Sequence, residues 1–311
     1  MIIPKRLQLG QTVMLLSVSS PTTPARLPLA VAALERLGLH VRVSETCTAQ
    51  YGNLAGSDAL RARELQAAFA DPTIDAILCV RGGYGATRIL PLLDLQAIAK
   101  TPKLFAGYSD VTALHIAFTQ QCGFETYHTP MPSTELYKLA EDDFTWQSYR
   151  QTLMADASNS YPLMNHPDEP RETLVGGKAT GRLIGGNLAL VQASLGTPFE
   201  IDCTDGILFL EDIDENTERI DRMLTQLRNA GKLAQLNGIL LGAWTNCGAV
   251  DEENPQNSLT LRQVFEQLLV PLNVPIVAGV TCGHVTPTLS LPMGRQVTMD
   301  ATNQTVIIHG V

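Results

Sequence analysis

The sequence predicts an α/β protein with two domains: an N-terminal doubly wound parallel-sheet (Rossmann-like) domain and a C-terminal β-rich (barrel-like) domain. The 311-residue chain is long for a single core. Its first half alternates strand and helix patterns, whereas short apolar runs with turn signals dominate beyond residue 177. We therefore expect an α/β domain over residues 1–157, a linker over 158–177 and a β-rich domain over 178–311.

The first half has the order of a parallel sheet covered by helices. Expected strands cover residues 13–17, 40–43, 76–80 and 104–107, and expected helices cover 25–37, 57–70, 86–93 and 111–121. Ser57 is placed to cap the second helix, which Asp71 and Pro72 end. Such sheets bind ligands at the carboxyl ends of their strands, where the glycine-containing turns after Val80 and Phe105 fall.

The second half is richer in strands. Expected strands cover 181–184, 206–210, 238–245, 275–280, 296–299 and 305–309. One clear helix is expected over 218–230, capped by Asn216 or Thr217 and closed by Gly231. The preceding residues 158–177 are polar and contain proline and asparagine, which is typical of a linker.

Composition and charge exclude several classes of protein. Apolar residues make up 45% of the chain and charged residues 17%, as in an ordinary globular protein. The net charge is −9 and no Lys/Arg cluster is present, so we expect no nucleic-acid partner. No apolar stretch is long enough for a bilayer, and the N-terminus does not resemble a signal peptide, so we expect a soluble cytoplasmic protein. The six cysteines lack C-x-x-C spacing, which favours reduced thiols over disulfides or zinc ligands.

Ser109 lies where a short apolar run meets a helical pattern, in the order Gly107-Tyr108-Ser109-Asp110. This is the layout of a nucleophile elbow, although Val111 stands where the strict G-x-S-x-G pattern has its second glycine. The residues alone leave a second interpretation open, because serine is also among the best helix N-caps.

A serine nucleophile needs a base, and six histidines are available. His115 stands more than one helical turn after Ser109 and is not expected to reach it. His128, at an expected strand end, and His284, in a loop between a glycine and a proline, are the two stronger candidates. The remaining three, His40, His166 and His309, are expected to be structural or exposed.

Glu211 ends the unbroken apolar run Gly206-Ile-Leu-Phe-Leu. A carboxylate that emerges from a buried strand is suited to orient a catalytic histidine. The alternative is a metal site in the acidic loop that contains Asp212, Asp214, Glu215 and Glu218, but this loop has neither calcium-loop spacing nor nearby histidines.

The turn Arg81-Gly82-Gly83-Tyr84-Gly85 follows an expected buried strand. It has neither dinucleotide-binding nor Walker spacing. Its glycines permit a backbone N–H to approach a reacting oxygen, and together with the Asp110 N–H they are candidates for an oxyanion hole. They equally fit a tight turn packed on the sheet.

Five ordered motifs carry a resemblance to a known family. They are V-R-G-G-Y-G, G-Y-S-D-V-T, G-R-L-I-G-G-N-L, F-L-E-D-I-D-E…R-I-D-R-M-L-T-Q-L and G-H-V-T-P-T-L-S-L-P-M-G. Across nearly the whole chain they resemble the LD-carboxypeptidase family of serine peptidases. The resemblance implies a triad of Ser109, Glu211 and His284. It further implies an oxyanion hole from Gly83, or less directly Gly82, and Asp110.

The same resemblance implies a substrate class and an assembly. Members cleave the peptide bond before a terminal D-amino acid, which in murein recycling releases D-alanine from a cytoplasmic tetrapeptide; they need no metal or organic cofactor and are usually homodimers. Arg81 and Arg222 are the cations nearest the motifs and are candidates for binding the substrate carboxylate, or for structural ion pairs.

Two other functions remain open from the sequence. The microcin-immunity branch of the family cleaves peptidyl-nucleotides and would need an aromatic side chain for the base, for which Trp146 and Trp244 are the only tryptophans. A non-enzymatic small-molecule binding protein would need no activated serine.

Overall fold

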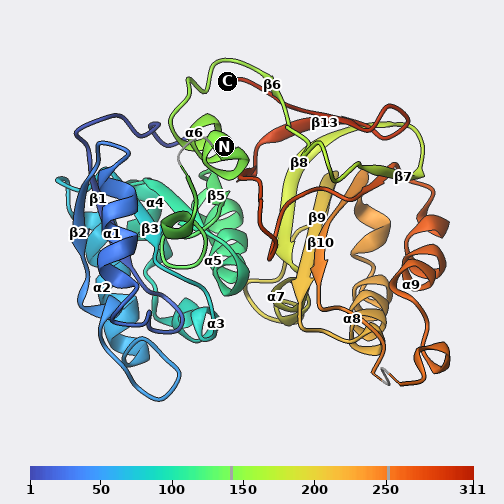
Figure 1. Cartoon of the computed structure of the whole chain (residues 1–311), viewed down its shortest axis with the longest axis horizontal. Helices are drawn as coiled ribbons and strands as arrows, with labels where there is room; N and C mark the ends of the chain where they lie inside the picture. Colours follow the sequence, from blue (N-terminus) through green and yellow to red (C-terminus); the bar gives the residue numbers. More distant parts are fainter. Residues whose placement is uncertain (141–142, 251–252) are drawn as a thin grey trace. The chain divides into compact units, whose positions relative to one another are not determined.

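The computed structural model describes residues 1–140, 143–250 and 253–311 (Figure 1). These residues form two compact units. The first contains Met1–Ala157 and Leu289–Gly294, and the second contains Ser158–Thr288 and Arg295–Val311. The segment Leu289–Gly294 was expected in the second domain; it joins the first unit because its strand pairs with the edge of the first sheet.

The first unit is built on one sheet with the strand order β12-β5-β4-β3-β1-β2. Its strands are β1 (Thr12–Leu16), β2 (His40–Val43), β3 (Ala76–Cys79), β4 (Leu104–Gly107), β5 (Thr126–His128) and β12 (Leu291–Met293). Strands β2, β1, β3, β4 and β5 are parallel, and only β12 runs antiparallel to its neighbour. The predicted parallel-sheet domain is therefore confirmed.

Helices cover both faces of this sheet. They are α1 (Leu27–Glu35), α2 (Asp58–Ala70), α3 (Ala86–Ile89), α4 (Leu95–Lys100), α5 (Thr112–Ala117) and α6 (Phe144–Leu153). Leu34 of α1 and Trp146 of α6 share one buried cluster with Leu78 and Ala106 of the sheet. Phe105, which alternates with Ala106 along β4, instead stacks near Phe69 of α2 on the opposite face.

The expected helix over 25–37 is shorter at both ends, as α1, and two other expected helices are interrupted. The expected helix over 86–93 ends as α3 at Ile89 and continues as a 3₁₀ turn, where Pro91 has no N–H for a helical hydrogen bond. The expected helix over 111–121 is divided into a 3₁₀ turn, α5 and a final π-helical turn. Ser57 caps α2 as predicted, because its side chain accepts from the Leu60 N–H.

The second unit contains a larger mixed sheet with the order β6-β14-β13-β8-β9-β10-β11-β7. Its strands are β6 (Tyr161–Pro162), β7 (Glu172–Val175), β8 (Lys178–Asn187), β9 (Gly206–Ile213), β10 (Gly238–Thr245), β11 (Ile276–Ala278), β13 (Gln296–Asp300) and β14 (Thr305–Ile308). Strands β8 to β11 are parallel, and the outer strands pair antiparallel. The β-rich unit is as predicted, but the sheet is open and no closed barrel is found among the described residues.

The expected linker over 158–177 contains the two edge strands of this sheet, β6 and β7. Their residues are at most half-buried, so they lack the apolar pattern by which a central strand is recognised. Tertiary pairing, rather than local sequence preference, makes them strands.

The helices of the second unit are α7 (Leu188–Ala193), α8 (Thr217–Asn229) and α9 (Leu261–Leu268), and α8 packs between the other two (Figure 1). Asn216 caps α8 through the Arg219 N–H, which decides between the two caps expected from the sequence. Helix α9 was not predicted, although Thr260 and Gln263 form a capping box at its start. None of the helices in the described parts of the chain combines the length and apolar character needed to cross a bilayer.

Candidate active site

Ser109 lies at the turn between β4 and the following helix, with an unusual backbone conformation. Its φ angle is +66°, in the left-handed region that residues with a side chain rarely adopt. The 3₁₀ turn η3 begins at Ser109, and Tyr108 occupies the N-cap position. The interpretation of Ser109 as an N-cap is therefore wrong, and the strained turn has the geometry of a nucleophile elbow.

His115 hydrogen-bonds the backbone at the end of β4, next to this elbow. Its Nε2 lies 2.8 Å from the Gly107 carbonyl oxygen, and its Nδ1 lies 2.9 Å from Thr126 Oγ1. Because a carbonyl can only accept, Nε2 donates to Gly107 and Nδ1 accepts from Thr126. Burial lowers the pKa of His115 to about 4, so the ring is neutral at pH 7. His115 thus holds the end of β4 and does not act on Ser109, as its position in the sequence predicted.

The glycine turn after β3 passes directly against the serine. A Cβ added to Gly82 would lie 3.0 Å from Ser109 Cβ and 3.2 Å from Ser109 Oγ. Gly83 has a φ of +122°, and a side chain there would collide with Ser20. The glycine turn therefore approaches the Ser109 hydroxyl at a distance that leaves no room for a side chain at Gly82.

Asp110 follows the serine, and its carboxylate is buried, with 3% exposure. Its Oδ2 accepts a 2.6 Å hydrogen bond from Ser19 Oγ and a 2.7 Å hydrogen bond from the Ala86 N–H at the start of α3. Burial raises the pKa of Asp110, while these donors, Ser19 first, favour its charged form. The elbow is thus joined to the loop after β1 and to the glycine turn.

Glu211 and His284 lie together in the second unit. Glu211 stands on β9 opposite Asn187 of the parallel strand β8, and its side chain is fully buried. Its Oε2 is 2.7 Å from His284 Nδ1 and accepts from the His284 N–H at 3.3 Å. A carboxylate on Nδ1 favours the tautomer in which Nε2 carries no proton and can act as a base.

Three neighbours hold the His284 loop in this orientation. Gly283 has a φ of +122°, and a Cβ there would lie 2.6 Å from Glu211 Oε2, so the close approach needs glycine. Thr245, the last residue of β10, donates through Oγ1 to the His284 carbonyl at 2.5 Å. Thr288 Oγ1 accepts from the Gly283 N–H at 3.2 Å. Two side-chain hydroxyls thus hold the backbone at Gly283 and His284.

Asp212 supports the same strand end. It accepts from Asn187 Nδ2 at 2.7 Å and from the Ala189 N–H at 3.0 Å. Burial, and to a smaller extent the charge of Glu211, raise the pKa of Asp212 to about 6. Asn187 in turn caps α7 through the Leu190 N–H. The G-G-N-L and L-E-D motifs therefore form one hydrogen-bonded junction.

The carboxylates of the acidic loop that was considered as a metal site each bind a different protein group. Asp214 accepts from Asn246 at 2.9 Å, Glu215 pairs with Arg219 at 2.8 Å, and Glu218 accepts from Ser258. Among the described residues, no group of three or more His, Cys, Asp and Glu side chains is arranged to hold a metal ion.

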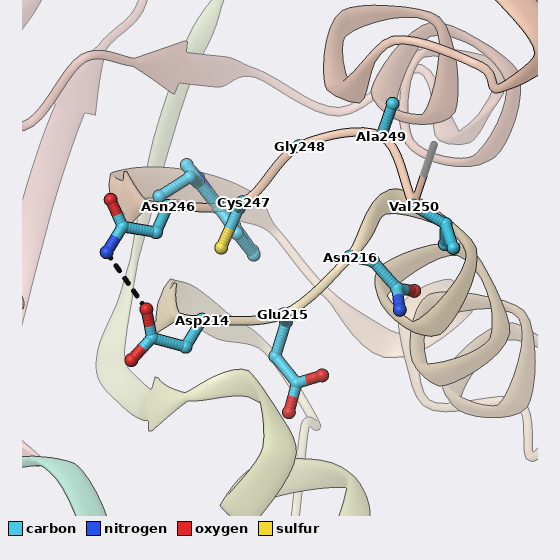
Figure 2. A pocket seen from close by; sticks show the side chains of 9 residues that line it. Asp214, Glu215, Asn216, Asn246, Cys247, Gly248, Ala249 and Val250 are labelled. Carbon is cyan, nitrogen blue, oxygen red and sulfur yellow. Dashed lines mark hydrogen bonds between the residues drawn. The ribbon is translucent and has the colours of Figure 1, made fainter. Parts of the chain in front are cut away.

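A pocket of about 790 Å³ opens beyond the ends of β9 and β10 in the second unit (Figure 2). Asp214 and Glu215 come from the loop after β9, and Asn246 and Cys247 from the loop after β10. Trp244 also lines it. Trp244 and Asn246 flank Thr245, the residue that holds the His284 carbonyl, so the pocket wall and the His284 loop share one strand end.

The remaining candidates occupy less specific positions. Arg81 is half-buried, and its guanidinium donates to the Gly82 and Pro21 carbonyls at 3.2 and 3.4 Å. Arg222 is exposed on α8. His128 is buried on β5 with its ring 5.4 Å from that of Tyr108, whereas His284 has a carboxylate on Nδ1. Of the two histidine candidates, His284 has the partner that a catalytic base requires.

The sequence predictions thus fall into two groups. Ser109, Gly82, Gly83 and Asp110 lie together in the first unit, and Glu211 and His284 lie together in the second. Residues that hold these groups, such as Ser19, Asn187 and Thr245, were not predicted. Each follows or ends a buried strand, and a polar residue at the carboxyl end of a parallel strand is the signal that could have identified them.

Comparison with known proteins identifies the family of this chain. Residues 13–129 match the LD-carboxypeptidase N-terminal domain, and residues 180–299 match the LD-carboxypeptidase C-terminal domain. A probable murein peptide carboxypeptidase of Bacillus subtilis (strain 168) is 41% identical over 306 residues, covering 98% of this chain and 94% of its own length.

Two solved structures show the same fold. The muramoyltetrapeptide carboxypeptidase of Oxalobacter formigenes matches with a TM-score of 0.82 and 26% identity, over 96% of this chain and 98% of that one. The microcin C7 self immunity protein MccF, solved in complex with aspartyl sulfamoyl adenosine, matches with a TM-score of 0.88 and 25% identity, over 100% and 99% of the two chains. With both of its domains matched and its motifs placed at the ends of the strands, this chain belongs to the LD-carboxypeptidase family.

Proposed function

We propose that this protein is a serine carboxypeptidase that hydrolyses the bond before the C-terminal D-amino acid of a murein tetrapeptide and releases D-alanine. The observation that carries the proposal is the buried Glu211 carboxylate, 2.7 Å from His284 Nδ1, in a member of the LD-carboxypeptidase family. The similarity to a murein peptide carboxypeptidase and to a muramoyltetrapeptide carboxypeptidase supports the substrate.

In the proposed reaction, Ser109 is the nucleophile and His284 is the general base. His284 Nε2 takes the hydroxyl proton while Ser109 Oγ forms a bond to the carbonyl carbon, whose oxygen becomes an oxyanion. The N–H groups of Gly83 and Asp110 receive that oxyanion. His284 then gives its proton to the leaving amino group, and D-alanine departs from the acyl-enzyme.

Water completes the cycle. His284 removes a proton from the water molecule, the resulting hydroxide attacks the acyl carbon, and Ser109 leaves with the proton returned by His284. Glu211 keeps the imidazole in the required tautomer and stabilises its cation in both steps. This chemistry needs no metal or organic cofactor. Arg81 and Arg222 remain candidates for binding the substrate carboxylate. We propose that the protein acts in peptidoglycan recycling in the cytoplasm and that it forms a homodimer.

A second candidate function is the hydrolysis of a peptidyl-nucleotide by the same residues. Trp244 lines the pocket beyond β10, whereas Trp146 is fully buried, so Trp244 is the tryptophan that would stack on a nucleobase bound in this pocket. The similarity to MccF in complex with aspartyl sulfamoyl adenosine supports this candidate. A Trp244→Leu variant would then lose activity on the nucleotide substrate and keep activity on the tetrapeptide.

Mass spectrometry of the purified protein with three compounds tests the proposal. They are a murein tetrapeptide, its tripeptide product and a peptidyl-nucleotide. We expect loss of D-alanine from the tetrapeptide and no reaction of the tripeptide. Ser109→Ala is the control for contaminating peptidases, with turnover reduced roughly 10³-fold or more. Release of the nucleotide alone would support the second candidate, and no turnover of any substrate would favour a non-enzymatic binding protein.

A further inference from the structure

The Asp110 carboxylate is a buried charged group that the proposed reaction does not use. The reaction uses only the backbone N–H of this residue, next to the serine. The Oδ2 atom of the side chain accepts hydrogen bonds from Ser19 Oγ and from the Ala86 N–H, in two other segments of the first unit. A carboxyl group that costs free energy to bury lies directly beside the nucleophile, and its hydrogen-bond partners show which segments it joins.

The segment that Asp110 holds is the one that carries the other oxyanion donor. Gly85 is the N-cap of α3 and Ala86 is its first residue, so the hydrogen bond to the Ala86 N–H fixes the end of the glycine turn. Gly83 lies only three residues before this bond, in the same turn. Gly83 and Gly85 both have left-handed φ angles, of +122° and +116°, and carry no side chain of their own, so their positions depend on hydrogen bonds from neighbouring segments. Ser20 supplies two of these bonds, to the Gly82 carbonyl and from the Tyr84 N–H, and Asp110 supplies the one at Ala86.

Arg61 closes the same network from the other side. Its guanidinium is fully buried and donates to the carbonyls of Gly85 at 2.8 Å and Val18 at 2.5 Å. Val18 directly precedes Ser19, the hydroxyl donor to Asp110. Arg61 also forms an ion pair with Asp58 of α2. The loop after β1 and the turn after β3 are therefore joined twice, through the Asp110 carboxylate of the elbow and through the Arg61 guanidinium of α2.

We propose that the Asp110 side chain is a positioning residue for the oxyanion hole: it sets the distance between Ser109 and the Gly83 N–H by binding the turn that carries Gly83. Asp110 would thus supply one oxyanion donor, its backbone N–H, and orient the second donor, the Gly83 N–H, through its carboxylate. This inference rests on the proposed function for its kinetic readout. It also makes a structural prediction that does not depend on any substrate.

The kinetic test compares Asp110→Asn and Asp110→Ala with the wild type on the murein tetrapeptide. Removal of one oxyanion donor typically lowers kcat by about 10² to 10³, and we expect Asp110→Ala to approach this range and Asp110→Asn to lose less. KM and the dissociation constant of the tripeptide product should stay within about threefold, since the oxyanion forms only in the transition state. A matching loss in product affinity, or an unchanged kcat, would overturn the proposal.

The control variant is Asp94→Asn. Asp94 also accepts a hydrogen bond from a backbone N–H at a helix start, from Ala97 at 2.9 Å, but it is exposed at α4. Its substitution should leave kcat, KM and product affinity unchanged. Ser19→Ala provides a milder change, because it removes one donor and leaves the carboxylate. Should neither Asp110 variant fold, a kcat for Ser19→Ala equal to that of the wild type would contradict the proposal.

The structural test is amide hydrogen exchange over residues 82–86 of the full chain. We expect exchange there to accelerate at least tenfold in Asp110→Ala and to be unchanged in Asp94→Asn and Ser109→Ala. If the wild-type protein hydrolyses no tetrapeptide, the proposed function fails while this exchange measurement still decides whether Asp110 holds the turn. Unchanged exchange in Asp110→Ala would refute the positioning role.

Discussion

Glu211 Oε2 lies 2.7 Å from the Nδ1 atom of His284 and 3.3 Å from its backbone nitrogen, so a single carboxylate oxygen orients both the ring and the peptide of the histidine. The carboxylate has no exposure, whereas 15% of the His284 side chain is exposed. The carboxylate of the pair is therefore shielded from solvent, whereas the histidine ring is partly accessible to it.

Glu211→Gln should preserve this geometry and still impair catalysis. An amide can occupy the same volume, but it cannot stabilise an imidazolium as a carboxylate does. We expect kcat on the tetrapeptide to fall by roughly 10² to 10⁴, judging from comparable triad substitutions. Steady-state kinetics before and after EDTA check this, since the proposed chemistry is unaffected by chelation. Loss of wild-type activity in EDTA, restored by a divalent cation, would show that Glu211 serves a metal instead.

Gly283→Ala should separate His284 from its carboxylate. The added Cβ would lie 2.6 Å from Glu211 Oε2, and the φ of +122° is strained for alanine. We expect a loss of about 1–3 kcal/mol in the free energy of unfolding and a large loss of activity. Gly248→Ala is a suitable control, because nothing lies within 4 Å of the position its Cβ would take. Equal activity of the two variants would argue against a close Glu211–His284 contact.

Asp212 should make the protein less stable as the pH rises. Its pKa in the folded protein is raised to about 6 from 3.8, so between these values the unfolded chain has lost a proton that the folded protein keeps. The stabilisation is complete below about pH 4 and is lost as the pH rises through 6, and it amounts to roughly 3 kcal/mol at most. Urea unfolding of the wild type and Asp212→Asn at pH 4, 5, 6 and 7 should show the two curves diverging in this window. Parallel curves would contradict the raised pKa.

Mixing Ser109→Ala with His284→Ala protein tests where the proposed triad is built. Each variant should be inactive alone. If every triad comes from one chain, dimers exchanged between the two variants remain inactive, which is the result we expect. Recovery of a substantial fraction of wild-type activity would show that Ser109 and His284 act from different subunits. Size-exclusion chromatography of the mixture, with one variant carrying a mass tag, establishes that exchange has taken place.

Local sequence was sufficient for those features that depend on short-range pattern. The alternation of apolar runs and amphipathic helices predicted the parallel sheet, because a strand buried on both faces is a continuous apolar run, whereas a helix on its surface has apolar residues every three or four positions. Ser57 at the start of α2 was predicted because a cap acts on the next three residues only. The candidate residues Ser109, Glu211 and His284 were identified by motif and by their positions after apolar runs.

Tertiary structure alone decided what depends on residues distant in the chain. The linker over 158–177 supplies β6 and β7 because the edges of the larger sheet offer unpaired backbone groups, a pairing that no local pattern encodes. Ser109 has a φ of +66° in a turn whose neighbours are distant in sequence or structure: His115 bonds the Gly107 carbonyl, Asp110 accepts from the Ala86 N–H, and Gly82 lies against the Ser109 side chain. The amino-acid sequence identifies the candidate reactive groups, whereas hydrogen bonds between strand ends orient them. These bonds join segments distant in the chain, such as Ser19 and Asp110, which are 91 residues apart, so only the tertiary structure can show them.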